Sequence, residues 1–313
     1  MRLEGRDAEG LLRSIGAIAL GAGVILLLVH KGGGGDWTKF ERFLVADAPA
    51  SLLFVLALAG AREQAQGAEW WRSVLLVVSI LLSVLALFLF VEWIGADTKH
   101  LLYDAAVLVV TAAVAWFGAR RANSPYAVLL AALSLLVAWL LVWIKILDHP
   151  GNNSVRWVIL AGGAILLVVA RSLGESATLG AREVATVGGL GLVVAGVFGV
   201  FVGTVELVGG LFSEGLGARL GLHHISGAQT PGWDAFLIVA AVGLIWLGAR
   251  TATRGLGYVG ALGLVLFVAS TGAQLTRVES GEAPSSSLWG WPLGLVIFGV
   301  IALLLPVVRS RRE

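Results

Sequence analysis

Charged residues within long apolar stretches are the side chains of this sequence that could do chemistry. Seven of them stand near the start or end of an apolar run: Asp47, Asp104, Asp234, Glu92, Glu206, Lys145 and Arg156. A charge inside a bilayer costs about 2.5–3.5 kcal/mol on insertion scales, so each charged group needs a reason to be there. If the runs are membrane helices, all seven fall towards one leaflet. The acids could then form a polar ligand site, with the two cations as counter-charges.

Helix capping is the alternative explanation for the aspartates. An aspartate in the first turn of a helix meets the positive end of the helix dipole, which is worth about 0.3–1 kcal/mol. Capping accounts well for Asp104 and Asp234. It accounts less well for Asp47, because residues 40–46 already look helical and Pro49 follows closely. An acid beside a proline-broken helix recurs at transport sites, which makes Asp47 the sharpest candidate.

The two cations also have a simpler interpretation. Lys145 could pair with Asp148, three residues further along the same helix face. It could equally extend its ammonium group to the membrane surface, as long cationic side chains do. Arg156 begins the sixth apolar run and could simply pair with another charge.

Histidines offer a second type of chemistry, because all five fall on the same side of the membrane as the acids. They are His30, His100, His149, His223 and His224. The chain contains neither an HExxH motif nor a pair of histidines four residues apart, the spacings typical of a helical metal site. We interpret the histidines as polar residues of the membrane interface. The sequence predicts no cofactor, no metal site and no catalytic residue.

Composition identifies the class of protein. Of the 313 residues 58% are hydrophobic and only 13% are charged, with a mean hydropathy of +0.90. Soluble domains have about 25% charged residues, so this chain has too few polar residues to cover a water-facing surface. We predict an all-α, polytopic transmembrane bundle that forms a single domain over residues 1–313. A net charge of +2 argues against nucleic-acid binding, and the absence of cysteine excludes disulfides and thiolate chemistry.

Apolar runs near the spanning length of about 20 residues recur throughout the chain. We predict ten spans, at residues 11–30, 40–61, 73–93, 101–119, 126–147, 155–170, 184–205, 233–249, 256–275 and 288–308. The sixth is the shortest. Lysine and arginine are distributed about fourteen to eight in favour of the side that holds both termini. The positive-inside rule therefore predicts a cytoplasmic (inner) membrane protein with both termini in the cytoplasm.

A repeated segment underlies this arrangement. Tyr103–Arg121 and Trp233–Arg250 both begin with an aromatic residue followed by Asp-Ala, and the apolar run of each ends in Ala-Arg. Asp47–Arg62 is a looser copy. Every second predicted span runs inward and ends in arginine, which predicts five helical hairpins of the same orientation. The arginines follow from membrane orientation alone, whereas the shared Asp-Ala position favours duplication.

Small residues predict which helix is central. Gly191, Ala195, Gly199 and Gly203 are spaced four apart and form a smooth stripe on one face of the seventh span. Such stripes let helix backbones approach closely, so this span should lie in the middle of the bundle. The following loop, residues 206–231, is either an amphipathic segment on the outer surface or a re-entrant flap.

These features lead to a function hypothesis with two alternatives. We predict a multi-pass membrane protein whose partner is the lipid bilayer and which transports or binds a small or lipidic molecule from the outer leaflet. A non-catalytic structural or assembly subunit, in which the charges only cap and pair, is the first alternative. A membrane enzyme that acts through the histidines and carboxylates is the second.

Overall fold

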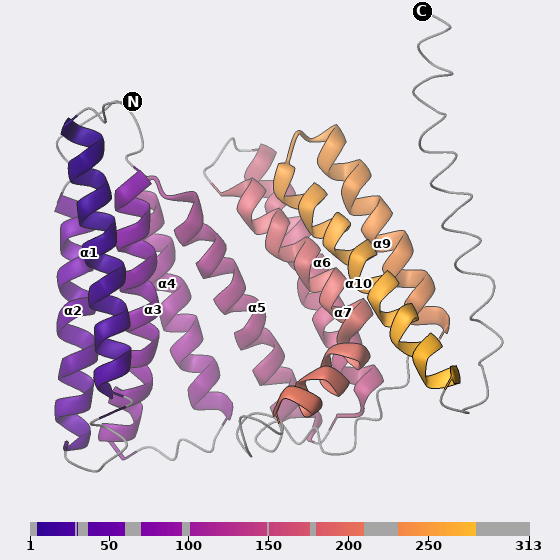
Figure 1. Ribbon diagram of the computed structural model, residues 1–313, viewed down its shortest axis with the longest axis horizontal. Helices are drawn as coiled ribbons and strands as arrows, with labels where there is room; N and C mark the ends of the chain where they lie inside the picture. The colour runs from indigo at the N-terminus through magenta and orange to yellow at the C-terminus, as the bar shows by residue number, and fades with distance from the viewer. Residues whose placement is uncertain are drawn as a thin grey trace, which may run out of the picture.

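The computed structural model describes residues 5–28, 30, 37–59, 70–95, 101–148, 150–175, 180–209 and 231–279 (Figure 1). In these residues the regular structure is helical. The helices are α1 (Gly5–Leu27), α2 (Lys39–Ala59), α3 (Trp70–Trp93), α4 (Leu101–Ala122), α5 (Pro125–Leu147), α6 (Asn152–Glu175), α7 (Ala181–Gly209), α9 (Pro231–Arg250) and α10 (Arg254–Glu279).

Eight of these helices are long and apolar enough to cross a membrane, and the apolar part of α10, Arg254–Phe267, is shorter. This confirms the all-α, multi-pass fold class. Each of the first nine predicted spans corresponds to one helix. The tenth, at residues 288–308, lies outside the described residues, so the count of ten stays a prediction.

The sixth span was predicted wrongly as the shortest. Helix α6 has 24 residues, more than the 20 of α9, and it runs through both Arg156 and Arg171. Treating charged residues as helix ends caused the error. Backbone hydrogen bonds continue through an arginine, since only its side chain has to find a polar environment. At about 1.5 Å per residue α6 is about 36 Å long, enough to cross the hydrocarbon layer of about 30 Å.

Proline does not break α2 either. The helix is continuous over Lys39–Ala59 with Pro49 inside it, although proline removes one backbone hydrogen bond. At the very next residue, the Ser79 hydroxyl of α3 donates a hydrogen bond of 2.8 Å to the backbone oxygen of Ala50. Neighbouring helices commonly satisfy the backbone around a membrane proline in this way.

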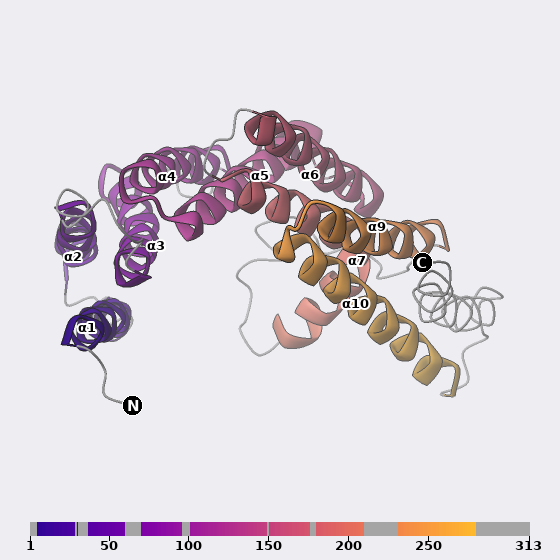
Figure 2. The same ribbon diagram turned by 90° about the horizontal axis from the view of Figure 1, so that it is seen from above.

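The helices form a curved row, from α1–α3 at one end to α9 and α10 at the other (Figure 2). Successive helices run in opposite directions (Figure 1). The ends of α4, α6 and α9 therefore lie on the same side of the row as the start of α1. We name this side the arginine end after Arg120, Arg171 and Arg250. The opposite side, which holds Asp104 and Asp234, is the carboxylate end. By the positive-inside rule the arginine end is predicted to be cytoplasmic.

The closest packing joins helices into hairpins. The most extensive contacts are α2 with α3, α4 with α5, α6 with α7 and α9 with α10. Within the described residues these are four hairpins of the same orientation, each turning at the arginine end. Two of the turns match in detail: Asn123 and Ala252 have φ angles of 52° and 51°. The hydrogen bonds that close them run from Ser124 N–H to Ala119 O at 3.1 Å and from Thr253 N–H to Gly248 O at 2.9 Å.

Helix α7 is the central helix, as its glycines predicted. It contacts α5, α6, α9 and α10. Over its most apolar stretch it is 56% buried, against 22–39% for the other spans. Its most extensive contact is with α6, where a Cβ atom on Gly163 would lie 2.8 Å from the backbone oxygen of Gly188 and 3.1 Å from the backbone nitrogen of Leu192. Gly191 and Ala195 of the predicted stripe are in the packed region, whereas the side-chain surroundings of residues 199 and 203 lie outside the description.

Candidate functional site

Two of the predicted site residues lie near enough to each other in the structure for their charges to interact. Arg156 in the first turns of α6 and Asp234 in the first turn of α9 are 2% and 7% exposed, respectively. Their charges interact electrostatically. Burial of either charge alone would be strongly unfavourable, so the two groups have to stay together. The pair lies at the carboxylate end, where α6 and α9 both begin.

Trp233 fixes the arginine from a second direction. The guanidinium carbon of Arg156 lies 5.2 Å from the centre of the Trp233 ring, which is a cation–π contact. The indole N–H of the same residue donates a hydrogen bond of 2.9 Å to Oδ1 of Asn153. Asn153 and Arg156 are three residues apart and share a face of α6, so Trp233 contacts that face at two points.

Apolar side chains surround the pair. Trp233 packs with Val155, Ile159, Ala195 and Phe198 in a buried cluster that joins α6, α7 and α9. Its ring also meets Trp157 and Phe236 edge-on at 5.5 and 5.6 Å. Such surroundings exclude water and lower the local dielectric constant, which strengthens every interaction of the two charges.

On the acidic side of the pair, one oxygen atom stands out. Oδ1 of Asp234 is buried and accepts no hydrogen bond from any of the residues that the structure describes. A buried acceptor that is not satisfied costs about 1–3 kcal/mol, and native proteins contain few of them. This oxygen can therefore accept a hydrogen bond from a hydroxyl or an amine, or bind a proton.

Glu92 is held at a different place. The Nζ atom of Lys39 lies 3.7 Å from its Oε1 and donates a hydrogen bond of 3.4 Å to its backbone oxygen. Both side chains are partly exposed, and such pairs contribute about 0–1 kcal/mol. Next to them Phe40, Phe43 and Trp93 pack together, with ring centres 5.0–6.3 Å apart. Glu92 thus joins the carboxylate ends of α2 and α3.

The other predicted acids occupy separate helices. Asp104 lies in the first turn of α4, as capping predicts. Asp47 is half-buried well inside α2, so it is not at a helix start like the aspartates of the two close copies. Because α2 and α9 stand at opposite ends of the row, Asp47 and Asp234 are far apart (Figure 2).

The remaining candidates are at the surface or outside the part of the chain that the structure describes. Lys145 is exposed in the last turn of α5. Glu206 lies in α7, and its side chain is outside the described part. His30 is exposed, and the other four histidines are not among the described residues. In the part of the chain that the structure covers, no three histidine, cysteine or carboxylate side chains form a group able to hold a metal ion.

Two features of the structure, the first of them in the repeat, were not recognised in the sequence. In both close copies a tryptophan stands four residues before the closing arginine, and the two side chains stack. The guanidinium carbon lies 5.0 Å from the ring centre for Arg120 on Trp116 and 5.3 Å for Arg250 on Trp246. Asn153 was also missed, although its position three residues before Arg156 was a visible signal.

The chain is a multi-pass helical membrane protein in which, among the described residues, a buried arginine and a buried aspartate face each other where α6 and α9 begin. Its helices fit a lipid bilayer as their surroundings. Comparisons with protein-family models, with curated proteins and with solved structures find no match for this chain.

Proposed function

We propose that this membrane protein binds, and moves, a small or amphipathic molecule that enters from the outer leaflet, with Arg156 and Asp234 as its polar anchor. The observation that carries the proposal is the buried carboxylate oxygen of Asp234, which accepts no hydrogen bond within the described structure. A buried ion pair that only joins helices stabilises best when every polar atom is satisfied. An unsatisfied acceptor beside a cation favours a ligand instead.

The chemistry of the site limits the ligand. A hydroxyl or amine would donate to Asp234, and an anionic or carbonyl oxygen would accept from Arg156. An apolar part would lie on the rings of Trp157 and Phe236, the first of which is 58% exposed on the outside of α6. A molecule with a small polar head and an apolar body fits this combination.

A substitution of the carboxylate tests the proposal. Asp234→Asn keeps the shape of the side chain and removes its charge. We expect the purified wild-type protein to retain a small molecule that native mass spectrometry detects and the variant to have lost it. Asp148→Asn is the matched control, because Asp148 is an exposed acid that follows α5 at the carboxylate end, where Asp234 also lies. Equal retention by wild type, variant and control would contradict the proposal.

A structural or assembly subunit is the second candidate, and one observation favours it. Apart from α7, the spans bury only 22–39% of their most apolar stretch. A row of helices with so much apolar surface could be covered by a second membrane protein as well as by lipid. In that case the Arg–Asp pair only fastens α6 to α9.

Exchanging the charges separates the two candidates. Arg156→Asp combined with Asp234→Arg keeps an ion pair and reverses it. If the pair is only a fastener, the double variant should recover the thermal stability that each single variant loses. Under the binding proposal stability also recovers, whereas ligand retention stays lost because the ligand's donor now faces a cation.

A further inference from the structure

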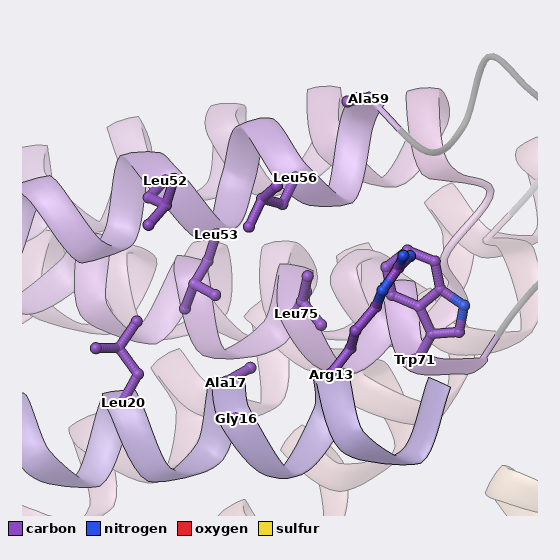
Figure 3. Close-up of a pocket in the computed structure, with 10 residues that line it drawn as sticks. All are labelled: Arg13, Gly16, Ala17, Leu20, Leu52, Leu53, Leu56, Ala59, Trp71 and Leu75. Carbon is purple, nitrogen blue, oxygen red and sulfur yellow. The ribbon is translucent and has the colours of Figure 1, made fainter. Parts of the chain in front are cut away.

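A cavity of about 480 Å³ lies between α1, α2 and α3, in the half of these helices nearer the arginine end (Figure 3). Leu20, Leu52, Leu56 and Leu75 form its apolar walls, and Arg13 and Trp71 close one end. Its volume falls in the range of about 300–1,000 Å³ that is typical of small-molecule sites. It is far from the Arg156–Asp234 pair along the row and lies at the other end of the helices.

Glycines explain why the cavity exists. Helix α1 approaches α3 closely, because a Cβ atom on Gly10 or Gly21 would lie 2.9 Å from Trp71 and Val78, respectively. Contacts between α1 and α2 are fewer. A Cβ atom on Gly16 would meet nothing within 4 Å, so space is left on the α2 side. Tight packing on one side of α1 thus leaves a gap on the other.

Two cations mark one end of the cavity. The guanidinium carbon of Arg13 lies 4.6 Å from the centre of the Trp71 ring, and that of Arg72 lies 5.4 Å from the same ring. Arg72 is only 8% exposed, whereas Arg13 is exposed and faces the cavity (Figure 3). Guanidinium groups match phosphate oxygens in pairs, so a phosphate fits the chemistry of Arg13 at this end of the cavity.

We propose that this cavity binds one anionic phospholipid of the leaflet at the arginine end, with an acyl chain along the leucines and the headgroup phosphate at Arg13. The helices around it cross a bilayer, so acyl chains are the molecules that surround it. Charge decides between lipids, because basic pockets between membrane helices at the cytoplasmic surface select anionic headgroups. Tryptophan at headgroup depth is the usual companion of such a site.

Photo-crosslinking on the full-length protein tests this site. The protein is reconstituted in phosphatidylcholine bilayers that contain a small fraction of either phosphatidylglycerol or phosphatidylcholine with the same photoreactive acyl chain. One added cation contact near the surface corresponds to about a fivefold preference. We therefore expect the anionic probe to label peptides of α1 and α2 about fivefold more than the zwitterionic probe.

Substitutions on α1 supply the controls. Gly16→Leu fills the cavity and should abolish labelling of both helices, whereas Gly23→Leu, on the same helix and away from the cavity, should leave it unchanged. Arg13→Gln, at an exposed position that folding tolerates, should bring the labelling ratio of the two probes close to one, and Arg13→Lys should restore part of it.

Three results would overturn the inference. Equal labelling of the wild-type protein by the two probes would exclude headgroup selection. Labelling of α1 and α2 by the anionic probe that persists in Gly16→Leu would place the lipid elsewhere. Displacement of the probe by millimolar inorganic phosphate would show that the arginines bind an anion without its acyl chain.

Discussion

Trp233 links two helices through chemically different contacts. Its ring face meets the guanidinium of Arg156, and its ring N–H donates to Asn153, both on α6. A cation–π contact in a site without water is worth about 2 kcal/mol, and a hydrogen bond about 1 kcal/mol net. The residue that opens one copy of the repeat is therefore also the one that holds the buried arginine.

At the residue scale, Trp233→Phe separates these two contacts. Phenylalanine keeps a ring for Arg156 and loses the N–H, so we expect a loss of about 1 kcal/mol of stability. In that background Asn153→Ala should cost almost nothing more, because the shared hydrogen bond is already gone. Thermal unfolding in detergent of the two single variants and the double variant measures this. Additive losses would show that the hydrogen bond does not couple the two residues.

At the element scale, backbone contact between α6 and α7 fixes the centre of the row. Gly163 of α6 leaves room for the backbone of α7, and Gly188 of α7 leaves room for the backbone of α6. The two helices therefore touch without side chains between them. Because lipid tails are as apolar as leucine, such close van der Waals contact is a main source of helix association in membranes.

Gly163→Ala should therefore destabilise the protein, although alanine is the better helix former. Its Cβ would lie 2.8 Å from the Gly188 oxygen, a backbone atom that cannot move aside. We expect a loss of about 1–3 kcal/mol, as for other overpacked sites. Gly243→Ala in α9 is the control, since nothing lies within 4 Å of its Cβ position. Detergent unfolding curves that coincide for the two variants would contradict a close contact between α6 and α7.

At the scale of the whole molecule, the distribution of arginine gives the row two different ends. All four hairpins in the described part turn at the arginine end, and α4 and α9 carry arginine in their last turns there. The Lys and Arg bias then predicts that this end faces the cytoplasm.

Thiol labelling tests this orientation, because the chain has no cysteine of its own. Gly151→Cys and Ala252→Cys each introduce one thiol at an exposed position, the first at the carboxylate end and the second at the arginine end. A membrane-impermeant maleimide applied to intact cells should label only Gly151→Cys, and both variants should react after lysis. Labelling of Ala252→Cys in intact cells would show that the arginine end faces outward and that the predicted topology is inverted.

Most of the fold could be predicted because membrane insertion depends on local composition. A run of apolar residues is enough to define a spanning helix, and four-residue spacing of small residues is enough to place α7 in the centre. The start of α6 was misplaced because Arg156 was treated as a boundary. Its neutralising partner is on α9, and no local pattern reveals which helices become neighbours.

The candidate site was predictable only in part, for the same reason. Arg156 and Asp234 could be recognised as charges that need an explanation, but their pairing depends on the first turns of α6 and α9 coming together. The sequence placed Glu92 in the same candidate set, although the structure holds it against Lys39 at the far end of the row. The sequence predicts which charged residues lie at the same depth in a membrane. It does not predict which helices bring those residues together.

The Arg156–Asp234 pair has a consequence for biosynthesis. The ribosome completes α6 before it makes α9, so Arg156 enters the translocon before its carboxylate exists. Until then we expect the guanidinium to stay at the lipid–water boundary, where an unpaired charge is least costly. Burial of Arg156 beside its carboxylate can then follow only after α9 has been made, so this part of the native packing waits for the second half of the chain.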